Sequence, residues 1–194
     1  GNKLIHNSIQ LSSWEVITPR IVEIPSEMSL YPMATLLDNL HDGLQVEIEA
    51  RDYDGLLFRT LEHLEKKDIH RINLRDASDI ISPLAALMAI SEGGEIFGAS
   101  HAKGKESNRI VRTKELLNIF SLNCAAKKDG LSLIGGEMPR IPKSPVDTHM
   151  DHRLAMTAVI LATYCGAEII NPEIIEVTHP EFMNMMKSLK LLQP

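Results

Sequence analysis

The chain has 194 residues, of which 44% are hydrophobic and 24% are charged, which is typical of a globular protein with a substantial buried core. Its formal net charge of −6 argues against a nucleic-acid-binding surface, so an anionic ligand would have to meet a local concentration of Lys and Arg. No apolar run is long enough to span a membrane and no signal peptide is visible, so we expect a cytoplasmic protein with no membrane partner.

In chain order, the hydrophobic pattern predicts strands at residues 16–23, 44–48, 69–74, 95–98, 124–128, 131–134 and 168–170. It predicts helices at residues 26–40, 56–67, 80–90, 105–120, 151–164 and 180–188. Pro32 is expected to kink the first of these helices. Asp129-Gly130 predicts a two-residue hairpin loop, and the glycines and prolines of residues 135–148 predict an irregular crossing.

The order helix, strand, helix, strand recurs three times along the chain. The first helix of each unit is the more apolar one, at 26–40, 80–90 and 151–164. This recurrence predicts an α/β domain of pseudo-threefold character, in which repeated βαβαβ-type units pack around buried helices. No G-x-G-x-x-G or Walker pattern supports a nucleotide-binding fold instead.

Cysteine and histidine usage indicates neither a disulfide framework nor a metal site. Cys124 and Cys165 are far apart and fit reduced, cytosolic thiols. His149 and His152 are three residues apart and could share a metal, but the sequence suggests no third ligand, so we predict no metal. The chain begins at Gly1 without a Met, which suggests an excised segment that lacks an N-terminal portion.

The segment Lys105-Glu-Ser-Asn-Arg109 is the first candidate for chemistry. If the helix begins at Lys105, that residue and Arg109 are four positions apart and share a helix face, where an anion between them would relieve their repulsion. A solvated helix start, with Glu106 favouring the helix dipole, explains the same spacing.

The segment Asp151-His-Arg153 is the second candidate. Asp151 is a natural N-cap, whereas a cation in the first turn of a helix opposes the dipole, and such a local misfit indicates a functional site. An arginine paired with a carboxylate elsewhere would explain it as well. Asp79 precedes a buried helix, and on spacing alone simple capping is the favoured interpretation.

At these residues the chain resembles the 5-enolpyruvylshikimate-3-phosphate synthase family, in its C-terminal globular domain. Lys105-Glu-Ser-Asn-Arg109 is similar to the family's lysine–glutamate–serine–aspartate–arginine motif, and Asp151-His-Arg-Leu-Ala-Met156 to its aspartate–histidine–arginine–x–alanine–methionine motif. Asp76-Ala-Ser-Asp79 resembles its catalytic-aspartate segment. The hairpin 129–136 and the segment 179–182 fall at matching places. The enolpyruvyl transferase that acts on UDP-N-acetylglucosamine differs at both basic motifs and fits less well.

The resemblance implies a fold, a partner lobe and a reaction. Residues 1–194 would form a single lobe of the inside-out α/β barrel type, with the firm match over 76–188 and with the N-terminal lobe absent from this chain. The reaction would transfer the enolpyruvyl group of phosphoenolpyruvate to the 5-hydroxyl of shikimate 3-phosphate and release phosphate, in the shikimate pathway of aromatic amino-acid biosynthesis. It passes through a tetrahedral ketal and needs no metal or organic cofactor.

The resemblance also implies roles for individual residues in catalysis. Asp79 would contact the shikimate hydroxyls and act as the base, Lys105 would lie near the same hydroxyls and take part in proton transfer, and Glu106 would be the acid. Arg109 and Arg153 would hold phosphoenolpyruvate.

Two further positions would complete the substrate contacts. His152 would orient the site, and His101 stands where the family often has a substrate-binding asparagine.

The sequence departs from the family pattern at several positions. Val177 replaces an expected phosphoenolpyruvate-binding lysine, residues 25–27 replace the usual glycine–aspartate–x–serine signature, and the turn after Phe120 lacks the usual glycine. The alternative function is therefore a catalytically inactive, degenerate lobe that binds an anion or a protein partner. In either case we expect negligible turnover from the isolated chain, because closure of the absent lobe would complete the site.

Overall fold

The structure is a computed structural model that describes residues 28–41 and 71–189. The strands expected at 16–23 and 44–48 and the helix expected at 56–67 lie outside the described residues.

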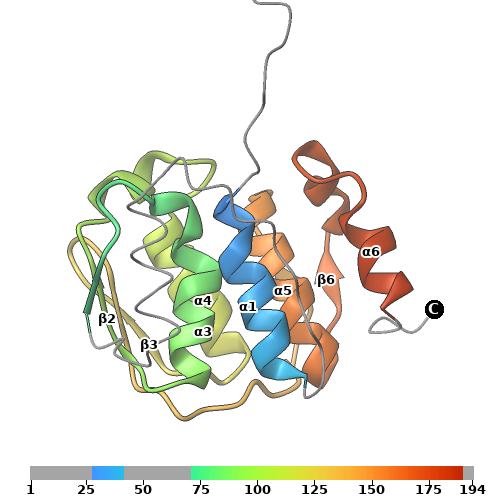
Figure 1. The fold of residues 1–194 in the computed structure, drawn as a ribbon, viewed down its shortest axis with the longest axis horizontal. Coiled ribbons are helices and arrows are strands. Elements are labelled where there is room, and N and C mark those ends of the chain that lie inside the picture. Colours follow the sequence, from blue (N-terminus) through green and yellow to red (C-terminus); the bar gives the residue numbers. More distant parts are fainter. Residues whose placement is uncertain (1–27, 42–70, 190–194) are drawn as a thin grey trace, which may run out of the picture.

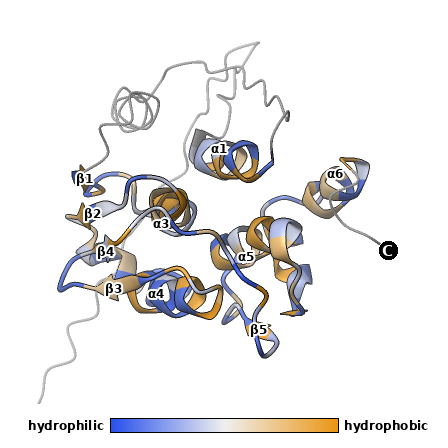
Figure 2. Cartoon of the chain, turned by 90° about the horizontal axis from the view of Figure 1, so that it is seen from below, coloured by the Kyte–Doolittle hydropathy of each residue, from blue (hydrophilic) through white to orange (hydrophobic). Residues whose placement is uncertain are grey.

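Three helices form the centre of the fold (Figures 1 and 2). They are α1 (Tyr31–Leu40), α3 (Ile81–Ile90) and α5 (His152–Cys165), and each contacts the other two. Residues 81–89 of α3 are buried on all sides, as expected from a helix with no polar face. The predicted arrangement around buried helices is confirmed.

A four-stranded sheet lies beside α3 and α4 (Arg109–Ile119) (Figure 2). Its order is β1 (Arg71–Asn73), β2 (Gly94–Phe97), β4 (Leu131–Leu133) and β3 (Cys124–Ala126). The β1–β2 pair is parallel and the other two pairs are antiparallel. A second, parallel pair joins β5 (Val146–Asp147) to β6 (Ile169–Ile170).

The parallel pairing of β1 and β2 brings two candidate segments to one edge. The carboxyl ends of parallel strands lie on the same side of a sheet. From these ends the chain enters two short 3₁₀ helices, η2 (Ser78–Ile80) after β1 and η3 (Ser100–Gly104) after β2, which contact each other. Asp79 lies in η2, and Lys105 follows η3 directly.

Two helix starts differ from the sequence prediction. Asn108 is the N-cap of α4 and accepts from the Val111 N–H at 3.3 Å, so the helix begins at Arg109 and the predicted start at Lys105 is wrong. The predicted first helix is a 3₁₀ turn, η1 (Met28–Leu30), followed by α1. Pro32 therefore lies in the first turn of α1, where a missing N–H breaks no intrahelical bond, and the expected kink has no cause.

The predicted hairpin is present, but its loop differs. Residues 127–130 connect β3 to β4, and the Lys127 N–H donates to the Gly130 carbonyl at 2.9 Å. The φ angle of Gly130 is not positive, so this glycine is not used for a left-handed turn.

The C-terminal part consists of η4 (Pro172–Val177) and α6 (Phe182–Ser188), which lie beyond β6 (Figure 1). Cys124 and Cys165 are free thiols. Within residues 28–41 and 71–189, no helix is long and apolar enough to cross a membrane, and no group of three or more His, Cys, Asp and Glu could hold a metal ion.

Candidate active site

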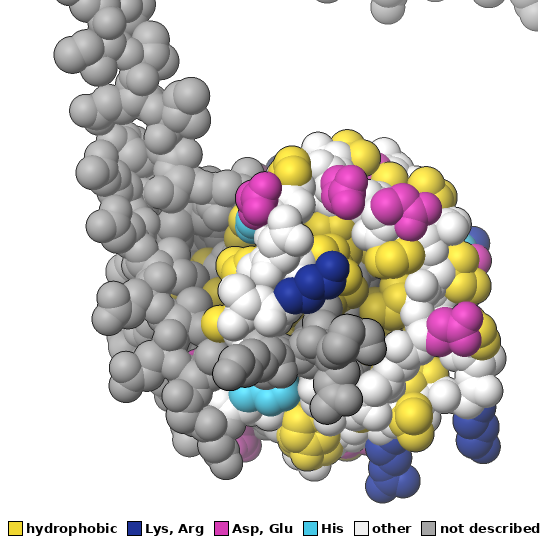
Figure 3. Space-filling model, turned by 90° about the vertical axis from the view of Figure 1, so that its right-hand side faces the viewer, with side chains coloured by type: hydrophobic (Ala, Val, Ile, Leu, Met, Phe, Trp, Pro, Cys, Tyr) yellow, Lys and Arg dark blue, Asp and Glu magenta, His cyan; other side chains and the backbone are white. Residues whose placement is uncertain are grey.

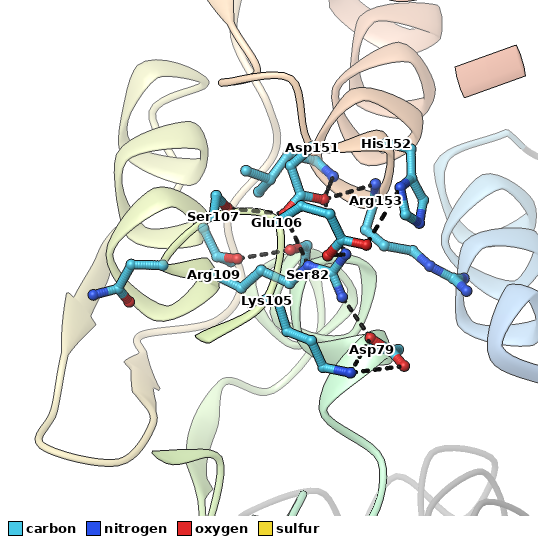
Figure 4. A network of polar contacts seen from close by, with 12 residues as sticks. Asp79, Ser82, Lys105, Glu106, Ser107, Arg109, Asp151, His152 and Arg153 are labelled. Atoms are coloured by element: carbon cyan, nitrogen blue, oxygen red, sulfur yellow. Dashed lines mark hydrogen bonds and ion pairs between the residues drawn. The ribbon is translucent and has the colours of Figure 1, made fainter. Parts of the chain in front are cut away.

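Arg109 is the centre of a polar network at one end of the helices (Figure 4). Its side chain is 1% exposed, yet its guanidinium donates to three carboxylates. Nε and Nη2 donate to the two oxygens of Asp151 at 2.9 and 3.2 Å. Nη1 donates to Asp79 Oδ1 at 2.5 Å, and Nη2 also donates to Glu106 Oε2 at 2.5 Å. We refer to Asp79, Lys105, Glu106, Arg109 and Asp151 as the charge cluster.

Asp151 is fully buried and joins two helix starts. It caps α5 by accepting from the backbone N–H groups of Arg153 and Leu154 at 3.0 and 3.5 Å, which confirms the predicted N-cap. The same carboxylate accepts from Ser107 Oγ at 2.8 Å, besides its bonds to Arg109. One buried side chain therefore fixes α5 against the start of α4.

Lys105 and Asp79 form the exposed side of the charge cluster. Lys105 Nζ lies 3.3 and 3.5 Å from the two oxygens of Asp79, and the side chains are 35% and 44% exposed. Lys105 and Arg109 lie close together, as expected, but they meet because both bind the Asp79 carboxylate and not because they share a helix face. Asp79 caps neither η2 nor α3, so the capping interpretation of this residue is wrong.

These contacts shift the ionisation of the carboxylates. Burial raises the pKa of Asp79, but hydrogen bonds and charge interactions with Lys105 and Arg109 outweigh it and the net pKa is lowered. Burial also raises the pKa of Asp151, and bonds from Arg109, Ser107 and the Arg153 N–H outweigh it, so this pKa is lowered too. Burial lowers the pKa of Arg109, and its carboxylate partners raise it more. Asp79 and Asp151 are therefore ionised, and Arg109 is protonated, near neutral pH.

The first turn of α5 adds two basic residues. His152 Nδ1 lies 3.8 Å from Glu106 Oε1, and burial and the nearby Arg153 lower the pKa of the ring. Arg153 is 8% exposed and extends toward η1 and α1, where Nη1 donates to the Ser29 carbonyl of η1 at 3.4 Å (Figure 4). The two arginines of the basic motifs therefore point to different neighbours.

His101 and Val177 are not joined to the charge cluster by any described contact. His101 lies on η3 and is exposed, four residues before Lys105. Val177 ends η4 and is 73% exposed.

Figure 3 shows the face that carries β6 and α6, where hydrophobic side chains lie among acidic ones. The exposed hydrophobic residues of these two elements include Ile170 and Met185.

The arrangement limits how Arg109 could bind an anion. A guanidinium has five N–H donors on three nitrogen atoms. Four hydrogen bonds already use all three of these nitrogen atoms in Arg109. A ligand that makes a bidentate contact must therefore replace Asp79 or Glu106, because the bonds to Asp151 are the most buried ones. The sequence did not predict the contacts of Asp151 with Arg109 and Ser107. Its only signal was that Asp151 is a natural N-cap for α5.

The chain matches one family over most of its length. The sequence model of the EPSP synthase (3-phosphoshikimate 1-carboxyvinyltransferase) family matches residues 21–186. A 3-phosphoshikimate 1-carboxyvinyltransferase from Helicobacter hepaticus is 33% identical over 116 residues, which is 59% of this chain and 26% of that protein. Those from Methanobrevibacter smithii and Saccharolobus islandicus are 36% and 33% identical, over 61% and 66% of this chain and 26% and 32% of their own lengths. The chain thus spans 26% to 32% of these relatives.

Solved structures show the same fold. Two structures of EPSP synthase from Acinetobacter baumannii superpose with TM-scores of 0.65 and 0.62, over 85% of this chain and 46% of theirs. Their sequence identities of 17% and 16% support the fold alone. Together with the family match over residues 21–186, they show that the chain belongs to the EPSP synthase (3-phosphoshikimate 1-carboxyvinyltransferase) family.

Proposed function

We propose that this chain supplies one half of an active site that transfers the enolpyruvyl group of phosphoenolpyruvate to the 5-hydroxyl of shikimate 3-phosphate. The observation that carries the proposal is the convergence of Asp79, Lys105, Glu106 and Arg109 at one end of the helices, from segments up to 30 residues apart. Carboxylates and cations within hydrogen-bond distance are what a reaction with two proton transfers and anionic substrates requires.

The addition step needs one base and one acid. The 5-hydroxyl oxygen bonds to C2 of phosphoenolpyruvate, Asp79 accepts the hydroxyl proton, and Glu106 donates a proton to the methylene carbon, which gives the tetrahedral ketal. Lys105 lies 3.3 Å from Asp79, where it could bind the same hydroxyl and share its proton. In the elimination step the C–O bond to phosphate breaks, Asp79 passes its proton to the departing phosphate, and the methyl carbon returns a proton to Glu106, so both side chains regain their starting states.

The cations would hold the charges of the substrates. Arg109 and Arg153 would bind the carboxylate and phosphate of phosphoenolpyruvate, and Arg109 would exchange Asp79 or Glu106 for the ligand. This exchange would also free the displaced carboxylate for proton transfer. His152, 3.8 Å from Glu106, would orient the acid, and His101 would contact the shikimate side.

The rest of the site would come from a lobe that precedes this one. The relatives are much longer than the matched segment, and the charge cluster has an exposed side at Lys105 and Asp79 onto which another lobe could close. We therefore expect the 194-residue chain alone to bind phosphoenolpyruvate weakly and to turn over negligibly.

A second candidate is a degenerate lobe that binds an anion or a protein partner without catalysis. The observation in its favour is Val177, which is 73% exposed at the position where the resemblance expects a lysine. The loss of one cation weakens the hold on phosphate but leaves the charge cluster unchanged.

Calorimetry and turnover separate these functions. Phosphoenolpyruvate should bind the chain, and Arg153→Ala should weaken binding about tenfold or more, as expected when a charge-assisted hydrogen bond is lost. Arg140→Ala is the matched control, because Arg140 is exposed outside the cluster. Phosphate release should appear only when the natural preceding lobe is joined to the chain. Binding without phosphate release by that longer protein would favour the degenerate lobe, and no effect of Arg153→Ala would refute the proposed site.

A further inference from the structure

The Asp129-Gly130 pair has no role in the proposed chemistry, yet it contacts the end of β2, the strand from which the chain continues to Lys105. The pair lies in the loop between β3 and β4, beside the end of β2. Asp129 Oδ2 accepts from the Gly98 N–H at 3.1 Å, and the Asp129 carbonyl accepts from the Ala99 N–H at 2.7 Å. One residue of the hairpin therefore binds two consecutive N–H groups where the chain leaves β2.

Gly130 explains why the hairpin can approach so closely. A Cβ atom on Gly130 would overlap the Ile96 carbonyl and lie 3.0 Å from Phe97 Cα. Gly130 is thus a glycine because its backbone lies directly against β2. The Asp129 side chain is held over Gly98 by this contact.

Gly98 is also the point where the exits of β1 and β2 meet. Its φ of +74° suits glycine, and a Cβ atom there would overlap Asn73 Oδ1. Asn73 Oδ1 accepts from the Arg75 N–H at 3.0 Å, which forms the turn toward Asp79. The Leu74 N–H donates to the Phe97 carbonyl at 2.9 Å. The chain toward Asp79 and the chain toward Lys105 are therefore fixed against each other at Gly98.

The path from this point to Lys105 is short and is anchored by two buried alanines. Ala99 and Ala102 are fully buried, and the Ala102 N–H donates to the Ala99 carbonyl at 2.9 Å. The 3₁₀ helix η3 ends at Gly104, and Lys105 comes next, with Nζ 3.3 Å from Asp79. A shift of Ala99 would therefore move η3 and change the separation of Lys105 and Asp79.

We infer that Asp129 is a positioning residue, which holds the Gly98–Ala99 backbone so that Lys105 stays within ion-pair distance of Asp79. Its relevance to shikimate 3-phosphate binding rests on the function proposed above. The ion-pair geometry itself does not, and can be tested without a ligand.

The ligand-free test is a ¹³C NMR titration of the Asp79 carboxyl. Lys105 lowers this pKa, so Asp129→Ala should raise it toward the ordinary 3.8 by moving Lys105 away. Asp129→Asn keeps an acceptor oxygen and should leave the Asp79 pKa close to that of the wild type. Lys128→Ala, in the same loop and exposed, is the control. An unchanged Asp79 pKa in Asp129→Ala would overturn the inference. If Asp129→Ala does not fold, Asp129→Gly, which also removes the acceptor oxygen, takes its place with the same expected rise and the same overturning result.

The binding test is a double-mutant cycle with Lys105. By calorimetry, Asp129→Ala should weaken shikimate 3-phosphate binding about fivefold, as expected for one lost hydrogen bond, and much less in the Lys105→Ala background. Equal losses in the two backgrounds would show that Asp129 does not act through Lys105. If the wild type does not bind shikimate 3-phosphate, the proposed function fails, while the titration still decides whether Asp129 positions Lys105.

Discussion

The charge cluster and η4 occupy positions that the family resemblance assigns to one site, but their chemistry differs. In the charge cluster, Arg109 is 1% exposed and bonded to three carboxylates. At the end of η4, Val177 is apolar and 73% exposed. The residues of the charge cluster are constrained by the fold as well as by any ligand. The Val177 side chain is constrained by neither packing nor charge.

Under the proposed function, this difference explains how a binding site can be retained in part. Asp151 is needed for stability whether or not a ligand binds, because it caps α5 and neutralises a buried arginine. A lysine at position 177 would contribute only to ligand binding, so its loss costs the fold nothing. A retained charge cluster is therefore weaker support for catalysis than a retained exposed cation would be.

The largest expected effect is from Asp151→Ala. It leaves Arg109 without its most buried partner and removes the cap of α5, so the free energy of unfolding should fall by about 3–5 kcal/mol. Urea denaturation measures this loss. Asp151→Asn keeps a capping oxygen and should cost less.

Asp76→Ala is the control for that substitution, because Asp76 is an exposed carboxylate close in sequence to Asp79. It should change the unfolding free energy by less than about 0.5 kcal/mol. Similar losses in Asp151→Ala and Asp76→Ala would mean that the buried ion pair between Asp151 and Arg109 adds no stability.

Stability should fall in two steps as the pH is lowered. Burial and Arg153 lower the pKa of His152 in the folded protein, so the unfolded chain takes up a proton at this residue first as the pH falls. The first loss of stability therefore begins below about pH 6.5. The pKa values of Asp79 and Asp151 are lowered, so their contribution is complete above about 3.8 and is lost as the pH falls through the folded-state values. Urea midpoints between pH 8 and pH 3 would show both steps.

His152→Gln is the matched variant for the first step. The difference between its stability and that of the wild type should change between pH 7 and pH 5 and be constant above pH 7. A difference that does not vary with pH would contradict the lowered pKa of His152.

The local features of the fold were predictable from the sequence, but the long-range polar contacts were not. The hydrophobic periodicity located α3 and α5, and the side-chain chemistry of Asp151 identified the N-cap. The bond between Arg109 and Asp151 joins residues 42 apart, so it depends on how α4 packs beside α5, which no local pattern contains.

The start of α4 shows the same limit at short range. Lys105 and Asn108 can both begin a helix, but Lys105 is the extended C-cap residue of η3, with φ of −79° and ψ of −161°, so the helix begins only after Asn108. Asp79 was interpreted as a cap because only its neighbours in sequence could be considered. Its partners Lys105 and Arg109 come from another segment.

Val177→Lys tests the η4 side of the comparison. The added cation should tighten phosphoenolpyruvate binding by roughly 1 kcal/mol, the value of one partly solvated charge interaction, without changing the unfolding free energy. Calorimetry gives the affinity, and Val177→Gln is the uncharged control. Equal binding by both variants would mean that position 177 does not face the anion.

The smallest effect concerns the one described side-chain contact between the turn before α5 and the turn before η4. Met150 and Asn171 both have positive φ, 56° and 51°, and Asn171 Nδ2 lies 3.6 Å from Met150 Sδ. Met150→Gly relieves a left-handed backbone that costs about 1–2 kcal/mol for a residue with a Cβ, but glycine adds about 0.5–1 kcal/mol of unfolded-state entropy. Thermal unfolding should therefore show a gain of no more than about 1 kcal/mol.

Ser121→Gly separates backbone strain from the contact with Asn171. Ser121 is exposed and has φ of 65°, but it lies after α4, away from Asn171 in sequence. If strain alone matters, Met150→Gly and Ser121→Gly should stabilise the protein to the same extent. A smaller gain, or a loss, in Met150→Gly would mean that the sulfur–amide contact holds the start of η4 against the start of α5. The charge cluster and η4 would then be held in place relative to each other by this contact, although their chemistry differs.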